Sequence, residues 1–199
     1  SEDTQRLQNI FRKLMRFTAF VSFPAMLGLA IVSQELIVIS ITEKWLPCVP
    51  VMQILCVWGA FMPISTLYSN LMNSIGRPNI YMWNTIALGI FQLLCVWGSY
   101  PYGLNVMLIV YTAANIFWLL IWHYFAHKHI GISLFNTLKD IAPYLIISVA
   151  VMTFTYWVAG YVKNIYLSLL VKVALAASLY IFLMWSLKSI VFRESLQYL

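Results

Sequence analysis

Long apolar segments recur along the chain, separated by short polar ones. Within each apolar segment the residues are continuously hydrophobic, without the alternation at every second position that a barrel strand shows over about ten residues. Each segment has roughly 18–25 residues, the length that a tilted helix needs to cross the hydrocarbon of a bilayer. The pattern predicts six membrane-spanning helices, over residues 17–41, 49–73, 80–97, 104–125, 141–162 and 166–187.

The composition supports a membrane protein and excludes two other broad classes. Of the 199 residues, 62% are hydrophobic and 9% are charged, whereas about 25% are charged in a typical soluble domain. The stretch 78–127 contains no Asp, Glu, Lys or Arg. So few charges cannot cover a water-exposed surface, and so hydrophobic a chain does not remain disordered. The predicted fold class is an all-α membrane protein with six transmembrane helices.

Basic residues are distributed unequally between the two ends of the predicted helices. Nine of the twelve Lys and Arg residues fall on one side, whereas Lys44 and Lys163 fall on the other and Lys172 lies within the last helix. Basic residues are enriched on the cytoplasmic side of a membrane. The bias therefore predicts that both ends of this segment are cytoplasmic, and an even number of spans requires them to share a side.

The first sixteen residues carry a basic amphipathic pattern. Leu7, Ile10, Phe11 and Leu14 recur at helical spacing, with Arg and Lys at positions between them. This predicts a helix that either lies on the cytoplasmic membrane surface or packs against the protein. The predicted division of the chain is a cytoplasmic amphipathic helix at 1–16, four transmembrane helices at 17–125, a cytoplasmic loop at 126–140, a C-terminal helix pair at 141–187 and a cytoplasmic tail at 188–199.

Helix-breaking residues interrupt two of the predicted spans. Pro24 and Gly28 lie in the first half of the first span, and Pro63 lies in the middle of the second. A proline inside a helix frees a backbone carbonyl and permits a kink. Pro24, Gly28 and Pro63 are therefore hinge candidates, with a passive kink as the alternative. Pro143 fits the first turn of the fifth predicted helix.

Two ionisable residues are predicted within the membrane. Glu35 and Lys172 each lie six residues from the same end of their helices, which is roughly 9 Å below the surface. Such groups are functional candidates by default. Lys172 either extends its long side chain outward to the surface, lines a water-filled cavity, or pairs with Glu35. The alternative for Glu35 is a solvated helix end.

A polar stripe follows the second predicted helix in its cytoplasmic half. Ser65, Thr66, Ser69, Asn70 and Asn73 share one arc of this helix. The stripe indicates either hydrogen bonds to a neighbouring helix or the wall of a hydrophilic lumen.

Other polar groups lie near this stripe or isolated in apolar spans. Arg77 follows the stripe at its cytoplasmic mouth, and Gln92 and Asn115 are isolated polar residues for which a helix-joining role is favoured. The substrate-pathway candidates are Glu35, Ser69, Asn70, Asn73, Arg77, Gln92 and Lys172.

No motif for bond chemistry stands out. The three cysteines, Cys48, Cys56 and Cys95, form no close pair. His123 and His127 are four residues apart, but no acidic residue or cysteine accompanies them, so a position at the cytoplasmic interface is expected. The sequence also lacks nucleotide-binding and hydrolase signatures. We expect no catalytic residue, no metal and no cofactor.

Three strings follow one another in an order that resembles a known family. They are DTQRLQNIFRKLMRFTAFVSFPAMLGLAIVSQELI, TEKWLPCVPVMQIL and LYSNLMNSIGRPNIY. They resemble the C-terminal half of bacterial polysaccharide flippases, the Wzx-type lipid-linked oligosaccharide translocases of the MATE-like MOP superfamily. The matching features are Phe23-Pro24 followed by Gly28, Lys44-Trp45 and Gly76-Arg77. Recognisable strings cover about residues 3–100.

The resemblance implies a larger protein with two lobes around a central cavity that opens alternately to each side. This segment would supply part of the second lobe and a C-terminal helix pair. The implied partners are an undecaprenyl-pyrophosphate-linked oligosaccharide, membrane lipids and the missing N-terminal half of the same transporter, with no nucleic acid. The chain begins at Ser1 without a methionine, and we expect it to be a fragment of a longer polypeptide.

The predicted function is therefore part of a flippase for surface polysaccharide biosynthesis in the bacterial inner membrane, and not an enzyme. One alternative is a multidrug or cation antiporter of the same superfamily, for which Glu35 is the acidic candidate within the membrane. A second is a membrane enzyme of glycan assembly, and a third is a purely structural membrane subunit.

Overall fold

The computed structural model describes residues 2–162 and 164–186, so Lys163, the end of the last predicted span at 187 and the predicted tail at 188–199 lie outside the described residues. The described part contains helices and short turns but no strand. Its α-helices are α1 Glu2–Ile31, α2 Ser33–Ser40, α3 Val49–Ser74, α4 Pro78–Ser99, α5 Leu104–Ile130, α6 Leu134–Ala159 and α7 Ile165–Ser186. Short 3₁₀ turns at Glu43–Cys48 and Tyr100–Tyr102 precede α3 and α5.

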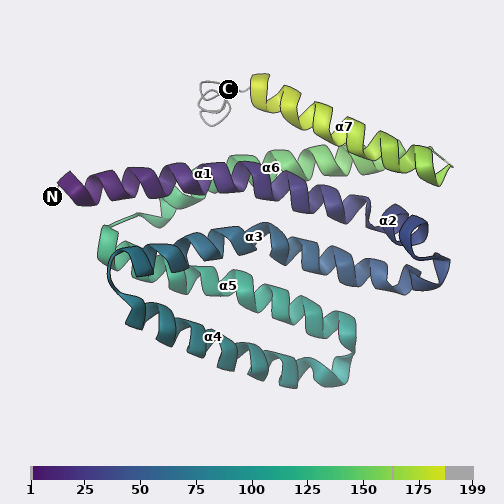
Figure 1. The fold of residues 1–199 in the computed structure, drawn as a ribbon. Coiled ribbons are helices and arrows are strands. Elements are labelled where there is room, and N and C mark those ends of the chain that lie inside the picture. Colours follow the sequence, from purple (N-terminus) through teal and green to yellow (C-terminus); the bar gives the residue numbers. More distant parts are fainter. Residues whose placement is uncertain (1, 163, 187–199) are drawn as a thin grey trace.

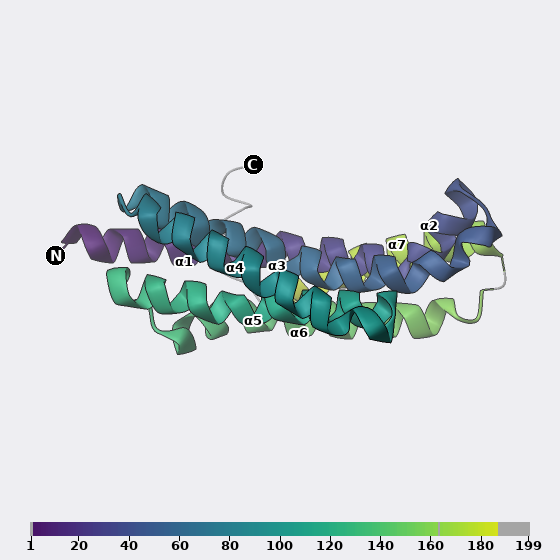
Figure 2. The same cartoon turned by 90° about the horizontal axis from the view of Figure 1, so that it is seen from below.

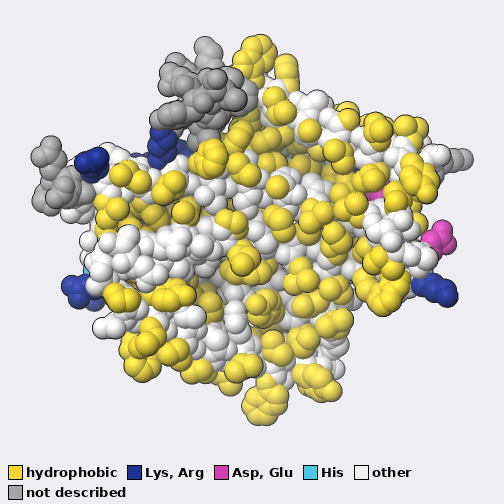
Figure 3. All heavy atoms as spheres, in the orientation of Figure 1, with side chains coloured by type: hydrophobic (Ala, Val, Ile, Leu, Met, Phe, Trp, Pro, Cys, Tyr) yellow, Lys and Arg dark blue, Asp and Glu magenta, His cyan; other side chains and the backbone are white. Residues whose placement is uncertain are grey.

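Six helical segments in the described residues are long and apolar enough to cross a membrane, and they begin at Thr4, Glu43, Pro78, Leu104, Leu134 and Ile165. Figure 3 shows hydrophobic side chains over the middle of the molecule, with Lys and Arg side chains near its two ends. This distribution matches an apolar band between two polar boundaries. The predicted all-α multi-pass membrane protein is therefore confirmed.

The long helices reverse direction from one to the next along the chain, but in space α1 lies beside α6, which runs the same way, and α3 lies beside α5, which also runs the same way (Figure 1). Helix α1 packs mainly against α3 and α6, α3 packs against α5, and α4 and α7 pack against α5 and α6 respectively. Consequently α4 and α7 lie at opposite edges of the bundle, and α1 lies at its centre. Figure 2, seen from below, shows that the helices also share one elongated direction. The N terminus and the end of α7 point toward the same end of the bundle.

A repeat of four residues along α1 builds the centre of the core. Phe11, Met15, Ala19 and Phe23 are almost completely buried, because residues four apart lie on one face of a helix. They belong to one cluster with buried residues of α3, including Ala60. Lipid is as apolar as such a core, so helix association depends on close packing, which small residues allow.

The N-terminal amphipathic segment is not a separate helix on the membrane surface. Residues 2–16 continue without interruption into the membrane-spanning part of α1. Phe11 and Met15 turn into the core, whereas Ile10 and Leu14 remain about half exposed. The pattern is amphipathic because this part of α1 packs on the protein, which was one of the two alternatives left open by the sequence.

Three other boundaries differ from those predicted. The first span ends at Ile31, and the short α2 follows after a break at Val32. The region 126–140 is mostly helical, because α5 continues to Ile130 and stops where Gly131 adopts a left-handed φ of 72°, which a glycine accepts without strain. Helix α6 begins at Leu134, so Pro143 lies inside it and not in its first turn.

The packing at the centre of α1 yields a test of the fold. We expect Ala19→Leu to lower the free energy of unfolding by about 1–3 kcal/mol, because Ala19 has no exposed surface and extra methylenes strain a packed core. Thermal melting of the detergent-purified protein measures the effect. Ala150→Leu, at an exposed position of α6, is the matched control, and equal melting temperatures for the two variants would contradict this packing.

Candidate functional site

The polar stripe of α3 does not join α3 to another helix within the described chain. Thr66 and Ser69 donate hydrogen bonds back to carbonyls one turn earlier, to Met62 at 3.1 Å and to Ser65 at 3.1 Å. Asn70 and Asn73 are exposed. Side chains that join helices bond across the interface, and no such bond involves these residues in the described part of the chain. The two alternatives for the stripe, a lumen wall or contact with another helix, therefore stay predictions.

Arg77 and Gln92 have different surroundings. Arg77 is exposed in the turn between α3 and α4, directly after Gly76, whose φ of 71° lets the chain reverse. Gln92 donates a hydrogen bond of 2.8 Å from Nε2 to Oδ1 of Asn115, which joins α4 to α5. Arg77 is therefore free to contact a ligand at the end of the stripe, whereas Gln92 fulfils the helix-joining role.

Glu35 and Lys172 form a buried ion pair. Lys172 Nζ lies 2.5 Å from Glu35 Oε1, and both side chains are less than one-tenth exposed. Lys172 also donates to the carbonyl of Ile31 at 2.8 Å, and Ser168 donates to the same carboxylate oxygen of Glu35 at 2.8 Å. Lys172 therefore points into the protein and does not extend to the membrane surface, which was one of its three alternatives. Its ion pair holds the start of α2 against α7.

The Lys172 ammonium also occupies a position that suits its charge. Ile31 is the last residue of α1, and the carbonyls at a helix C-terminus carry partial negative charge. A cation there satisfies a carbonyl that lies beside the break at Val32. The break in the first predicted span is thus stabilised by a residue 141 positions away.

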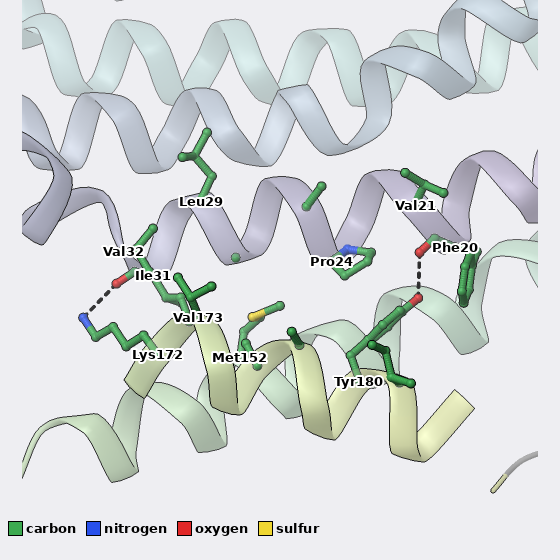
Figure 4. A pocket seen from close by; sticks show the side chains of 15 residues that line it. Phe20, Val21, Pro24, Leu29, Ile31, Val32, Met152, Lys172, Val173 and Tyr180 are labelled. Carbon is green, nitrogen blue, oxygen red and sulfur yellow. Dashed lines mark hydrogen bonds between the residues drawn. The ribbon is translucent and has the colours of Figure 1, made fainter. Parts of the chain in front are cut away.

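Pro24 has a partner that the sequence did not indicate. A proline at position 24 cannot donate to the carbonyl of Phe20, four residues earlier. The hydroxyl of Tyr180, on α7, donates to this carbonyl at 2.8 Å. Figure 4 shows Tyr180 and Lys172 reaching α1 from the same helix, one at Phe20 and one at Ile31. The irregular part of α1 is held at two points by α7.

The other hinge candidates have weaker structural signatures. Pro63 lies inside α3 without ending it, and near it Ser22 donates to the Ala60 carbonyl at 2.7 Å. A Cβ on Gly28 would lie 3.5 Å from the Met152 side chain, an ordinary contact. No close approach demands a glycine there. The hinge roles of Pro24, Gly28 and Pro63 stay predictions.

A second charged cluster lies in the N-terminal half of α1, and the sequence analysis did not predict it. Asp140 of α6 is buried and accepts from Arg12 Nε at 2.6 Å and from Arg16 Nη1 at 3.2 Å. The signal that points to it is its isolation, because Asp140 is the one acidic residue between positions 44 and 193. The cluster fixes the N-terminal half of α1 to α6.

His123 packs inside the bundle, and its predicted place at the level of the cytoplasmic interface stays a prediction. Its side chain is buried, and its Nδ1 lies 3.1 Å from the Tyr68 hydroxyl of α3. His127, one turn later, is exposed and its Nδ1 lies 2.9 Å from the Ile132 carbonyl. These two histidines therefore join elements at this end of the bundle.

The fold and these groups define a multi-pass helical membrane protein with buried polar links and an exposed polar stripe. Comparison with known proteins finds similarity to one family over part of the chain. Residues 1–50 match the family described as polysaccharide biosynthesis protein. An uncharacterized membrane protein in the cps region of Klebsiella pneumoniae is 31% identical over 91 residues, which are 45% of this chain and 19% of that protein.

A second relative is the lipopolysaccharide biosynthesis protein WzxC of Escherichia coli, 32% identical over 91 residues, 45% of this chain and 18% of WzxC. The aligned part of the chain thus spans less than a fifth of either relative. No solved structure matches the chain. These matches confirm the resemblance to Wzx-type polysaccharide flippases for the part of the chain that they cover.

The buried ion pair yields a test by double substitution. We expect Glu35→Gln and Lys172→Met to cost about 3 kcal/mol each, because each leaves a buried charge without its partner. The double variant should cost much less than the two together, since no unpaired charge remains. Thermal melting of the purified variants measures this coupling. Additive losses would mean that the two residues are independent.

Proposed function

We propose that this chain forms part of a transporter that moves a lipid-linked oligosaccharide across the bacterial inner membrane for surface polysaccharide biosynthesis. The observation that carries the proposal is the match of residues 1–50 to the polysaccharide biosynthesis family. The names of the two relatives, one from a cps region and one for lipopolysaccharide biosynthesis, point the same way. The resemblance adds undecaprenyl pyrophosphate as the lipid carrier.

The mechanism that we propose is alternating access without bond chemistry, so the protein is a transporter and not an enzyme. The exposed stripe of α3, with Asn70 and Asn73, would form part of a hydrophilic wall that the rest of the transporter completes. Exposed amides and hydroxyls suit sugar hydroxyls, because both donate and accept hydrogen bonds. Arg77, at the end of the stripe, would attract the pyrophosphate by charge.

The antiporter alternative is less well supported. It requires an acidic group free to exchange a cation, and the candidate within the membrane was Glu35. This carboxylate is paired with Lys172 at 2.5 Å. The names of the relatives also refer to polysaccharide regions and lipopolysaccharide.

We further propose that the N terminus and the end of α7 face the cytoplasm, in line with the excess of basic residues there. Cysteine labelling tests this orientation in a background without Cys48, Cys56 and Cys95. Thr42→Cys, before the turn that leads to α3, should react with a membrane-impermeant maleimide in spheroplasts. Ser133→Cys, before α6, should react only after permeabilisation. The reverse reactivity would overturn the orientation.

The proposed lumen wall predicts an export defect. Thr66→Val combined with Asn70→Leu should lower surface polysaccharide several-fold at unchanged protein level, because the wall loses its hydrogen-bonding groups. Quantification of polysaccharide in a strain whose chromosomal copy carries the change measures this. Thr153→Val is the matched control, since Thr153 is also exposed and also bonds to its own helix, at 2.8 Å. Normal export in the first variant would remove the stripe from the pathway.

A further inference from the structure

Two cavities follow one another along α7, and they differ in character. A cavity of about 330 Å³ is lined by polar groups of Gln34, Glu35, Ser168 and Lys172 and by Tyr156. A groove of about 530 Å³ follows on the next turns of α7, where apolar side chains of α1 and α7 line it (Figure 4). Lys172 belongs to both linings. A polar cavity thus borders directly on an apolar groove.

The apolar groove has the dimensions of a hydrocarbon chain. On α7 it extends from Lys172 to Ile181, which is roughly 14 Å along a helix. On α1 it extends from Phe20 past Pro24 to Ile31. Both helices are long and apolar enough to cross the membrane, and Lys172, at one end of the groove, is the one charged residue in its lining among the described residues. The charged end and the apolar length of the groove match a lipid molecule whose head lies at Lys172 and whose tail extends toward Tyr180.

In the ion pair that lines the polar cavity, one N–H of Lys172 has no oxygen acceptor among the described residues and one carboxylate oxygen of Glu35 has no donor. The Lys172 ammonium also lies 5.3 Å from the centre of the Tyr156 ring. An ammonium has three N–H donors, and Lys172 uses two of them on Glu35 and Ile31. Glu35 accepts from Lys172 and Ser168 through Oε1, while its buried Oε2 has no hydrogen-bond partner among the described residues. A buried acceptor without a partner is costly. The cavity therefore favours a group that offers both a cationic donor and an anionic acceptor.

We propose that the polar cavity and the apolar groove together form a binding site for a membrane phospholipid with a phosphoethanolamine head. Its ammonium donates to Glu35, its phosphate accepts from Lys172, and one acyl chain lies in the groove between α1 and α7. This site is independent of the proposed transport of oligosaccharide, because it lies beside α7 and not along the stripe of α3.

The charge of the site argues against other lipid heads. A purely anionic head meets Glu35 as well as Lys172, and the two charges cancel. A choline head carries a cation but no N–H donor, so it leaves the acceptor of Glu35 unfilled. A phosphoethanolamine head is neutral overall, as the pair is, and it supplies both missing partners.

Native mass spectrometry of the purified full-length protein tests the proposal without changing a residue. The protein is titrated with phosphatidylethanolamine, phosphatidylcholine and phosphatidylglycerol that carry identical acyl chains. We expect phosphatidylethanolamine to be retained about tenfold more strongly than either of the others. It alone brings a cationic N–H donor to the Glu35 carboxylate, because choline has no N–H and the hydroxyls of phosphatidylglycerol are uncharged and accompany a net negative head. Retention of phosphatidylcholine equal to that of phosphatidylethanolamine would overturn the proposal. Retention of phosphatidylglycerol equal to that of phosphatidylethanolamine would also overturn it.

Variants of α7 test the groove in the same experiment. Ala177 lines the groove and is exposed, so Ala177→Trp should fill the groove and abolish the preference for phosphatidylethanolamine. Ala174, on the same helix, is also exposed but does not line the groove. Ala174→Trp should therefore retain the preference. Loss in both variants or in neither would place the lipid elsewhere. Polysaccharide export is measured separately and can fail without affecting this result.

Discussion

Inside hydrocarbon, a carbonyl or a charge without a partner costs several kcal/mol, because no water is present to satisfy it. This constraint explains why α7 packs where it does. Helix α1 has two irregular points, Pro24 and the break after Ile31, and α7 supplies a donor to a carbonyl at each. The donors, Tyr180 and Lys172, are eight residues apart on one face of α7. The irregular half of α1 thus depends on the C-terminal helix pair.

The other half of α1 depends on the same pair through charge. Asp140 of α6 neutralises Arg12 and Arg16, which lets a basic segment pack on protein instead of remaining in water. Between these two attachments, Phe11 to Phe23 fill the space against α3. Helix α1 is therefore attached by polar contacts to α6 in its first half and to α7 in its second. Three residues of the α3 stripe remain exposed in this arrangement, namely Thr66, Asn70 and Asn73.

Much of the fold could be predicted from local sequence, because hydropathy over about 20 residues identifies a span. The ends of the helices could not be predicted in this way, because polar residues extend a helix when their side chains find partners on neighbouring helices. Residues 2–16 extend α1 for this reason, and Gly131, not the polarity of 126–140, ends α5.

The links between helices were harder to predict, since spacing along the chain does not say which helices are neighbours. The sequence left pairing with Glu35 as one of three alternatives for Lys172, and it missed Asp140 and Tyr180 as partners. In each case the partner lies more than 120 positions away. The stripe of α3 was found because its periodicity is local. The structure adds that two of its hydroxyls bond within α3, and its role as a lumen wall stays a proposal.

We propose that this chain serves the transfer of a lipid-linked oligosaccharide across the membrane. The most direct measurement depletes the protein in a polysaccharide-producing strain and follows the lipid-linked oligosaccharide. The account predicts that this intermediate accumulates, stays inaccessible to a periplasmic oligosaccharide-modifying enzyme, and becomes accessible when the protein is restored. If the intermediate neither accumulates nor changes its accessibility on depletion, the account is contradicted.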